Sequence, residues 1–286
     1  MNDSDSIRFV FFGSSAFSVY VLEALKEKGF RPSLIVTFPD KPAGRKMILT
    51  PNPVKEWAKR ENLKLLEAEN FKDESVLEKL RSENAEVFVV ASFGQILPDA
   101  LIQMPKFQTL NVHPSLLPKL RGPSPIQTAI LKEEGTGVSI MKLNQKMDEG
   151  PIIVEKKVDF PEWPLGYKEA EEKLGQEGGI LLSSVLPQWI HGEIKETPQD
   201  QSLATYTKKI TKEDGDITKD SPEKALKKIK AFEVWPKAYI YHTKKNGQTE
   251  RIIVLNAHIQ DGELVLDQVI PAGKKTMGWA DYLKGN

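Results

Sequence analysis

An Asn and a His two residues apart are the side chains whose types and spacing best fit a chemical task. Asn111 and His113 lie in QTLNVHPSLLP, where an apolar run typical of a strand ends in a proline-containing loop. Side chains two apart in an extended segment point to the same face. An Asn amide suits a developing oxyanion, and a His nitrogen titrates near neutrality. The pair predicts acyl-group transfer, although an isolated N-x-H is more often a structural strand end.

Asp148 is the third candidate for this site. The segment NQKMDEGPII places it in a turn bounded by Gly150 and Pro151, between two predicted strands. A carboxylate there is able to orient His113 and stabilise its cation, as in catalytic triads. Ser115 lies beside the His but lacks the strained GxSxG context of a nucleophile. The alternative interpretation of Asp148, as a surface turn residue without a role, stays open.

The elements expected to position these residues form a mainly parallel sheet. Short apolar runs typical of strands alternate with helical stretches and cover residues 7–12, 33–38, 63–68, 86–92 and 108–112. This alternation predicts a Rossmann-like α/β sheet covered on both faces, with ligands at the carboxyl ends of its strands. Two more strands, 136–143 and 150–160, precede a long helix that ends near residue 190. The first strand-to-helix turn has one glycine where a dinucleotide fingerprint needs three, so an NAD site is disfavoured.

A polar segment rich in Thr, Lys and Asp follows this predicted sheet domain. We expect a catalytic domain over residues 1–189, a linker over 190–205, and a small antiparallel β domain over 206–286. The last part holds 15 Lys and Arg against 11 Asp and Glu, which leaves 25 against 29 for the rest of this neutral chain. The C-terminal domain is therefore expected to be the basic one.

The composition excludes several other kinds of site. The chain has no Cys, which rules out disulfides, a thiolate nucleophile and Cys-based metal sites, and its four His are widely spaced. The N-terminus lacks the pattern of a signal or transit peptide, and no run of about 18 apolar residues occurs. We therefore expect a cytoplasmic protein with no metal and no membrane segment.

The motifs resemble those of the formyltransferases that use 10-formyltetrahydrofolate. LNVHPSLLPKLRG and MDEG are similar to that family's N-x-H, S-L-L-P and late Asp motifs, in the same order. VTFPDKPAGRKMILTPNPVKEWA is similar to a loop typical of the methionyl-tRNA formyltransferase family. The linker TPQDQSLATYTKKITKEDGDI and the C-terminal segments IKAFEVWPKAY and PAGKKTMGWADYLKG also resemble that family. The resemblance runs from about residue 7 to the end.

The resemblance implies an activity and a role for each candidate residue. The amino group of methionyl initiator tRNA would attack the formyl carbon of 10-formyltetrahydrofolate directly, through a tetrahedral intermediate, and tetrahydrofolate would leave. Asn111 and His113 would stabilise the oxyanion, and Asp148 would pair with His113 and assist proton transfer. The folate pocket would be formed by Phe93, Gly94, Gln95, Ile96, Leu97, Ser115, Leu116, Leu117 and Pro118. The tRNA would be bound by Arg45, which would contact its acceptor end, and by Lys46, Lys208 and Lys209.

Two departures from the family pattern bear on tRNA binding. After Arg45 and Lys46 the usual basic residues are replaced by Met47, Ile48 and Leu49, which predicts more apolar contact with RNA. The C-terminal domain is shorter than the family pattern by about the length of a β-hairpin, so we expect a truncated, OB-like barrel. We expect a monomer. Two alternatives remain open: a formyltransferase acting on an amino sugar nucleotide or another small amine, and a non-catalytic RNA-binding protein on the same scaffold.

Overall fold

The computed structural model describes residues 7–43 and 48–285. The chain divides into two compact units, and each is described by itself. The first unit contains the residues up to Pro123, Thr136–Asp159 and Glu171–Tyr206; the second contains Ser124–Gly135, Phe160–Ala170 and the residues from Thr207 onward. The expected boundaries of the catalytic domain, linker and C-terminal domain stay a prediction.

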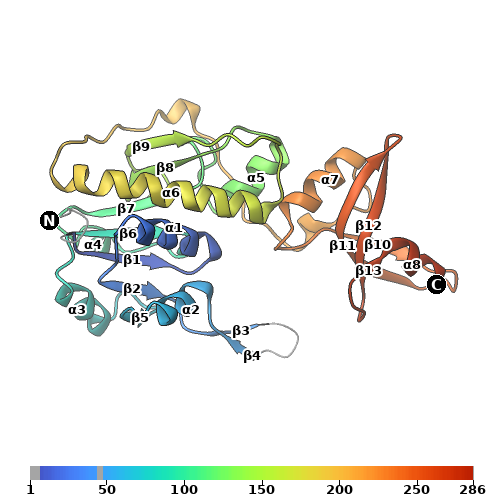
Figure 1. Cartoon of the computed structure of the whole chain (residues 1–286), viewed down its shortest axis with the longest axis horizontal. Helices are drawn as coiled ribbons and strands as arrows, with labels where there is room; N and C mark the ends of the chain where they lie inside the picture. The colour runs from blue at the N-terminus through green and yellow to red at the C-terminus, as the bar shows by residue number, and fades with distance from the viewer. Residues whose placement is uncertain (1–6, 44–47, 286) are drawn as a thin grey trace. The chain divides into compact units, whose positions relative to one another are not determined.

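A seven-stranded sheet forms the centre of the first unit (Figure 1). Its strand order is β5-β2-β1-β6-β7-β8-β9; the five strands from β5 to β7 run parallel, and β8 pairs antiparallel with both β7 and β9. The strands are β1 (Phe9–Gly13), β2 (Leu34–Thr37), β5 (Leu65–Glu67), β6 (Val87–Ala91), β7 (Thr109–His113), β8 (Gly137–Lys142) and β9 (Ile152–Lys157). The predicted mainly parallel α/β sheet is confirmed, and β7 is its last parallel strand.

Helices cover both faces of this sheet because its central strands are apolar on both sides. These helices are α1 (Ala16–Glu27), α2 (Pro53–Arg60), α3 (Glu74–Ser82), α4 (Asp99–Ile102) and α6 (Tyr167–Ile190). On one face, Phe12 and Phe88 pack in one core with Leu80 of α3 and Leu101 of α4. On the other face a Cβ added at Gly178 of α6 would lie 2.6 Å from Val112 of β7, so a glycine allows this close approach.

A short hairpin projects after β2, where the sequence predicted only a loop with constrained ends. Its strands are β3 (Lys41–Ala43) and β4 (Ile48–Thr50), which pair antiparallel (Figure 1). At its base the buried Lys55 ammonium lies 2.7 Å from both Asp40 Oδ1 and Glu67 Oε1, and Asn52 accepts from the Lys55 amide as the cap of α2. These contacts fix both ends of the hairpin to the first unit.

The second unit contains a small antiparallel sheet with the order β10-β11-β12-β13. Its elements are α5 (Pro125–Lys132), α7 (Pro222–Ala231), β10 (Tyr239–Thr243), β11 (Thr249–Gln260), β12 (Glu263–Pro271), β13 (Met277–Gly278) and α8 (Trp279–Lys284). The predicted β-rich C-terminal part is confirmed, although α7 lies within residues 206–286, where we expected an antiparallel β domain. Ile229 of α7 packs with Val254 of β11 in the core of this unit. Among the described residues, the helices are all too short or too polar to cross a membrane.

Candidate active site

Strand β7 carries the predicted Asn–His pair at its carboxyl end. Asn111 and His113 are both buried, with 8% and 5% of their surfaces exposed. The parallel register places Asn111 beside Val90 of β6, and the antiparallel register places His113 beside Ser139 of β8. Because side chains alternate along a strand, Asn111 and His113 share one face and Val112 points to the other. The structure therefore places the pair at the sheet edge where ligands of parallel α/β folds bind.

The ring of His113 is held by a backbone carbonyl. Its Nε2 lies 3.1 Å from the carbonyl oxygen of Leu120. A carbonyl oxygen only accepts hydrogen bonds, so Nε2 must carry a proton. The other nitrogen, Nδ1, lies 3.7 Å from Oδ1 of Asp148, and the two side chains are 6% and 14% exposed. Only Nδ1 is left to act on a reacting group, and it faces the carboxylate of Asp148.

Asp148 lies in the turn between β8 and β9, as the sequence predicted. Its backbone has φ of 53°, in the left-handed region that non-glycine residues seldom occupy. Its Oδ2 accepts a hydrogen bond of 2.8 Å from the amide of Gly122. A Cβ added at Gly150 would lie 1.8 Å from the carbonyl oxygen of Lys142, so the turn closes tightly on β8. The structure therefore brings together the predicted His and carboxylate, which are 35 positions apart in the printed sequence.

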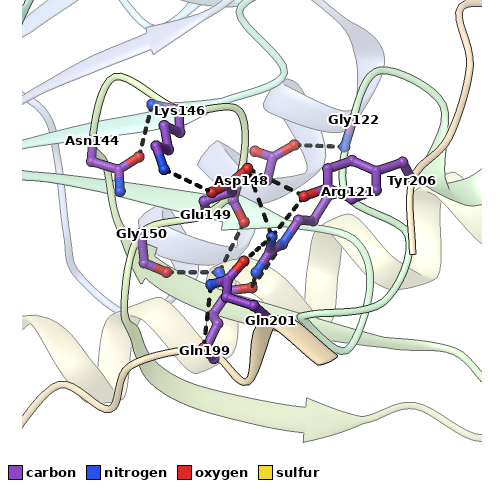
Figure 2. A network of polar contacts seen from close by, with 10 residues as sticks. All are labelled: Arg121, Gly122, Asn144, Lys146, Asp148, Glu149, Gly150, Gln199, Gln201 and Tyr206. Atoms are coloured by element: carbon purple, nitrogen blue, oxygen red, sulfur yellow. Dashed lines mark hydrogen bonds and ion pairs between the residues drawn. The ribbon is translucent and has the colours of Figure 1, made fainter. Parts of the chain in front are cut away.

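A buried guanidinium lies behind this turn (Figure 2). Arg121 is fully buried and donates to the side chains of Gln199, Gln201 and Tyr206. Gln199 in turn donates to the backbone carbonyls of Asp148 and Gly150. The sequence reasoning did not select Arg121 or Gln199. Neither residue stands in a local pattern that marks a role, because the contacts between Arg121 and Gln199 span 78 positions.

The residues predicted to bind folate follow the ends of β6 and β7, which are neighbouring parallel strands. After β6, Phe93 and Leu97 belong to the apolar core, Ile96 is 66% exposed, and Gln95 donates to the Glu69 carbonyl. Gly94 has φ of 67°, which turns the chain at the strand end. The two loops therefore leave adjacent positions of the same sheet edge.

The loop after β7 is fixed by Ser139 of β8. The buried Ser139 hydroxyl accepts from the Leu117 amide at 3.0 Å and lies 2.6 Å from the Ser115 carbonyl. The Ser115 hydroxyl donates to the Lys119 carbonyl, so it is engaged within its own loop. Leu117 is buried, while Leu116 and Pro118 are half-buried, and the Leu117–Pro118 peptide is cis. This loop is held in one conformation beside the Asn–His pair.

Comparisons with known proteins decide the family. The formyl transferase family matches residues 7–186. Methionyl-tRNA formyltransferase from Chloroflexus aurantiacus is 43% identical over 92% of this chain and 84% of its own length. That from Halalkalibacterium halodurans is 36% identical over 98% of this chain and 95% of its own. The chain belongs to the methionyl-tRNA formyltransferase family.

Solved structures of low identity share the fold with this family member. Methionyl-tRNA formyltransferase from Clostridium thermocellum gives a TM-score of 0.60 at 17% identity, covering 93% of this chain and 98% of its own. A sugar N-formyltransferase from Shewanella gives 0.61 at 18% identity, covering 85% and 95%. Both have the formyltransferase fold, so the fold alone does not select the acceptor amine.

The residues predicted to bind tRNA lie outside the described residues or in the second unit. Arg45 and Lys46 lie outside the described residues. Ile48 and Leu49 of β4 are 61% and 64% exposed. Lys208 and Lys209 are exposed in the second unit, and Lys208 pairs with Asp214. Their roles stay predictions.

Proposed function

We propose that the chain transfers the formyl group of 10-formyltetrahydrofolate to the amino group of methionyl initiator tRNA for translation initiation. The observation that carries the chemistry is the buried approach of His113 to Asp148 beside Asn111, at the carboxyl edge of the sheet. The acceptor is inferred from membership of the family, since the geometry of these three residues suits any formyl-accepting amine.

The reaction we propose is a direct attack on the formyl carbon. The amine nitrogen forms a bond to that carbon, and the electron pair of the C=O bond moves to the formyl oxygen. The Asn111 amide and the Nδ1–H of a protonated His113 donate to this oxyanion. Because Nε2 of His113 is engaged by Leu120, the ring donates to the oxyanion from Nδ1. Collapse of the intermediate breaks the bond from carbon to N10, and the proton lost by the amine is taken up by N10.

Asp148 supports this step through charge. Its carboxylate lies on the Nδ1 side of His113 and stabilises the imidazolium that donates to the oxyanion. It also accepts or relays the proton that the amine gives up on its way to N10. Neither step needs a covalent enzyme intermediate. In this proposal, Ser115 helps shape the loop and does not act as a nucleophile.

We further propose how the two substrates bind. The loops 93–97 and 115–118 would flank the pteridine ring of the folate, because both leave adjacent strand ends beside the catalytic trio. Arg45 and Lys46 would contact the acceptor end of the tRNA, and Lys208 and Lys209 would contact its phosphates. In this scheme residues 1–189 are the catalytic domain, 190–205 the linker and 206–286 the tRNA-binding domain of a cytoplasmic monomer. Phosphate contacts predict that tRNA affinity falls as salt rises.

The deciding experiment is a formyl-transfer assay with 10-formyltetrahydrofolate and methionyl initiator tRNA. Loss of one oxyanion donor, in Asn111→Ala or His113→Ala, should lower kcat by on the order of 100-fold or more. His191→Ala is the matched control, because that His is half exposed beside Glu193 and should leave the rate unchanged. Full activity of His113→Ala would remove the proposed mechanism. If the parent formylates an amino sugar nucleotide and not the charged tRNA, the proposed acceptor is wrong.

The proposed contacts with tRNA need a separate measurement. Arg45→Ala should raise KM for methionyl-tRNA while leaving KM for the formyl donor unchanged, because a guanidinium binds phosphate through paired hydrogen bonds. Lys209→Ala removes one positive charge from the second unit and should likewise raise KM for methionyl-tRNA. An Arg45→Ala enzyme with unchanged KM for tRNA would remove Arg45 from tRNA binding.

A further inference from the structure

The buried side chain of Arg121 has partners that all belong to the first unit. Its Nε and Nη2 donate to Oε1 of Gln199 at 2.9 and 2.6 Å. Its Nη1 donates to Oε1 of Gln201 at 2.8 Å and to the Tyr206 hydroxyl at 3.0 Å. Figure 2 shows these side chains converging on the guanidinium from the segment that follows the first unit's last helix. The partners satisfy a charge that is removed from water.

This arrangement fixes the orientation of the Gln199 amide. Its oxygen accepts two hydrogen bonds from Arg121, and a guanidinium has no acceptor, so the amide nitrogen must point away. That nitrogen donates to the carbonyl of Asp148 at 2.8 Å and to the carbonyl of Gly150 at 2.7 Å. With 7% of its surface exposed, Gln199 meets little competition from water for these bonds. Both carbonyls belong to the turn that carries the catalytic carboxylate.

The backbone on either side of Arg121 contacts both members of the His–Asp pair. The carbonyl of Leu120 accepts from His113, and the amide of Gly122 donates to Asp148. Thr205 holds this backbone: its hydroxyl accepts from the Leu120 amide at 2.8 Å and its carbonyl from the Arg121 amide at 2.9 Å. The segment from Gln199 to Thr205 therefore supports the turn and the histidine from one side.

Glu149 joins the same network beside the catalytic carboxylate. The Tyr206 hydroxyl accepts from Arg121 and lies 3.2 Å from Oε1 of Glu149, to which it donates. Arg121 Nη1 itself lies 3.9 Å from that oxygen. Arg121 is thereby connected to the side chain of Glu149 and, through Gln199, to the backbone of Asp148 and Gly150.

We propose that Gln199, oriented by Arg121, is a positioning residue that sets the approach of Asp148 to His113. This inference rests on the proposed roles of Asp148 and His113. Asp148 holds a left-handed backbone, which is costly for an L residue, and the two hydrogen bonds from Gln199 hold its own carbonyl and that of Gly150, two residues later in the turn. Without them the carboxylate loses its fixed distance from Nδ1 while substrate-binding loops are unchanged.

The test begins with Gln199→Glu and a matched control, Gln201→Glu. The first variant keeps an acceptor for Arg121 but has no N–H to give to the turn. The control makes the same change in the other amide that accepts from Arg121, whose own nitrogen donates to the Gln199 backbone. A displaced catalytic group costs on the order of 100-fold, so Gln199→Glu should lower kcat by about 10- to 100-fold with both KM values unchanged. The Gln201 nitrogen donates to the Gln199 backbone and not to the turn, so Gln201→Glu should keep its rate within about threefold of the parent.

The second arm repeats Gln199→Glu in an Asp148→Asn background. Residues that act through one another are non-additive. If Gln199 acts through Asp148, the substitution should lower kcat in the parent and leave the residual rate of Asp148→Asn unchanged. Equal fold-losses in both backgrounds would overturn the inference. If thermal melting shows that Gln199→Glu does not fold, Gln199→Met also removes the N–H donor. Because it removes an acceptor of Arg121 as well, its kcat is compared with that of Gln201→Met, which removes an acceptor of Arg121 but no donor to the turn.

The outcomes separate this inference from the proposed function. An inactive Asp148→Asn enzyme together with a fully active Gln199→Glu enzyme would overturn the positioning role and leave the mechanism standing. A fully active Asp148→Asn enzyme would overturn both. A loss in Gln201→Glu as large as that in Gln199→Glu would show that the network acts only by stabilising Arg121, which also overturns the inference.

Discussion

The two halves of the proposed catalytic trio are held in different ways. Asn111 and His113 belong to β7, a buried strand with hydrogen-bonded neighbours on both sides, so the pleat sets their direction. Asp148 belongs to a turn with a left-handed backbone, and residues 26 and 51 positions away hold its carboxylate and its carbonyl. The strand half depends on secondary structure, whereas the turn half depends on tertiary hydrogen bonds.

The largest effect on this contrast should come from Gly150→Ala. The added Cβ would collide with the Lys142 carbonyl, so the turn that carries Asp148 has to move while β7 stays in place. Displacement of a catalytic group by about 1 Å costs on the order of 100-fold in rate, and overpacking costs about 1–3 kcal/mol of unfolding free energy. Steady-state formyl transfer and urea unfolding measure the two effects.

Gly135→Ala is the matched control for that variant, since a Cβ at Gly135 would meet open space. Its rate and stability should equal those of the parent. A Gly150→Ala enzyme with normal kcat would show that the turn tolerates movement, and the contrast between the halves would disappear.

A pair of substitutions at Asp148 separates its charge from its backbone. Asp148→Asn and Asp148→Ala should both lower kcat by on the order of 100-fold, because each removes the carboxylate opposite His113. Asn tolerates the left-handed region, whereas Ala pays roughly 1–2 kcal/mol there. Urea unfolding should therefore show Asp148→Ala to be the less stable of the two. Equal stabilities would mean that the turn relaxes at no cost.

Thr205→Val tests whether the strand half is independent of the segment that supports the turn. Valine has the shape of threonine but no hydroxyl, so the Leu120 amide loses its acceptor beside a buried residue. An unsatisfied buried donor costs about 1–3 kcal/mol, which chemical denaturation measures. Since the Leu120 carbonyl holds His113, we also expect a loss of kcat smaller than that of Gly150→Ala. An unchanged kcat would show that β7 alone fixes the histidine.

The smallest effect should come from Ile48→Ser combined with Leu49→Ser in the hairpin outside both halves. These side chains are more than half exposed, so the free energy of unfolding should change by no more than about 0.5 kcal/mol. Any loss of activity should appear in KM for methionyl-tRNA. A fall in kcat with unchanged KM would connect the hairpin to the chemistry and weaken the contrast.

Local patterns were enough to predict the sheet and the strand half of the site. The apolar runs that predicted strands are β1, β2, β6 and β7 in the structure. The two-residue spacing of Asn111 and His113 predicted that their side chains share one face. The position of Asp148 in a turn followed from Gly150 and Pro151. That position made a pairing with His113 feasible but left a surface role for Asp148 open, and only the resemblance to a family assigned the carboxylate to the histidine.

The parts of the fold and of the site that the sequence did not predict depend on long-range contacts or on segments with no clear local pattern. Arg121 and Gln199 meet across 78 positions, and neither has a periodicity or a turn preference that marks its role. Helix α7 was missed because its first residues continue a polar, Lys-rich stretch typical of a linker. Strands β3 and β4 are three residues each, too short for alternation to show.

The polar stretch from Gln199 to Thr205 has a consequence for how this protein is divided or rebuilt. A recombinant fragment that stopped at residue 189 would contain Asn111, His113 and Asp148 but would lack Gln199, which holds the turn, and Thr205, which holds the backbone beside it. A chimaera that places another C-terminal module on this sheet should keep the native chain through Tyr206. The chain leaves the first unit for the last time after Tyr206, and not at Ile190, where α6 ends.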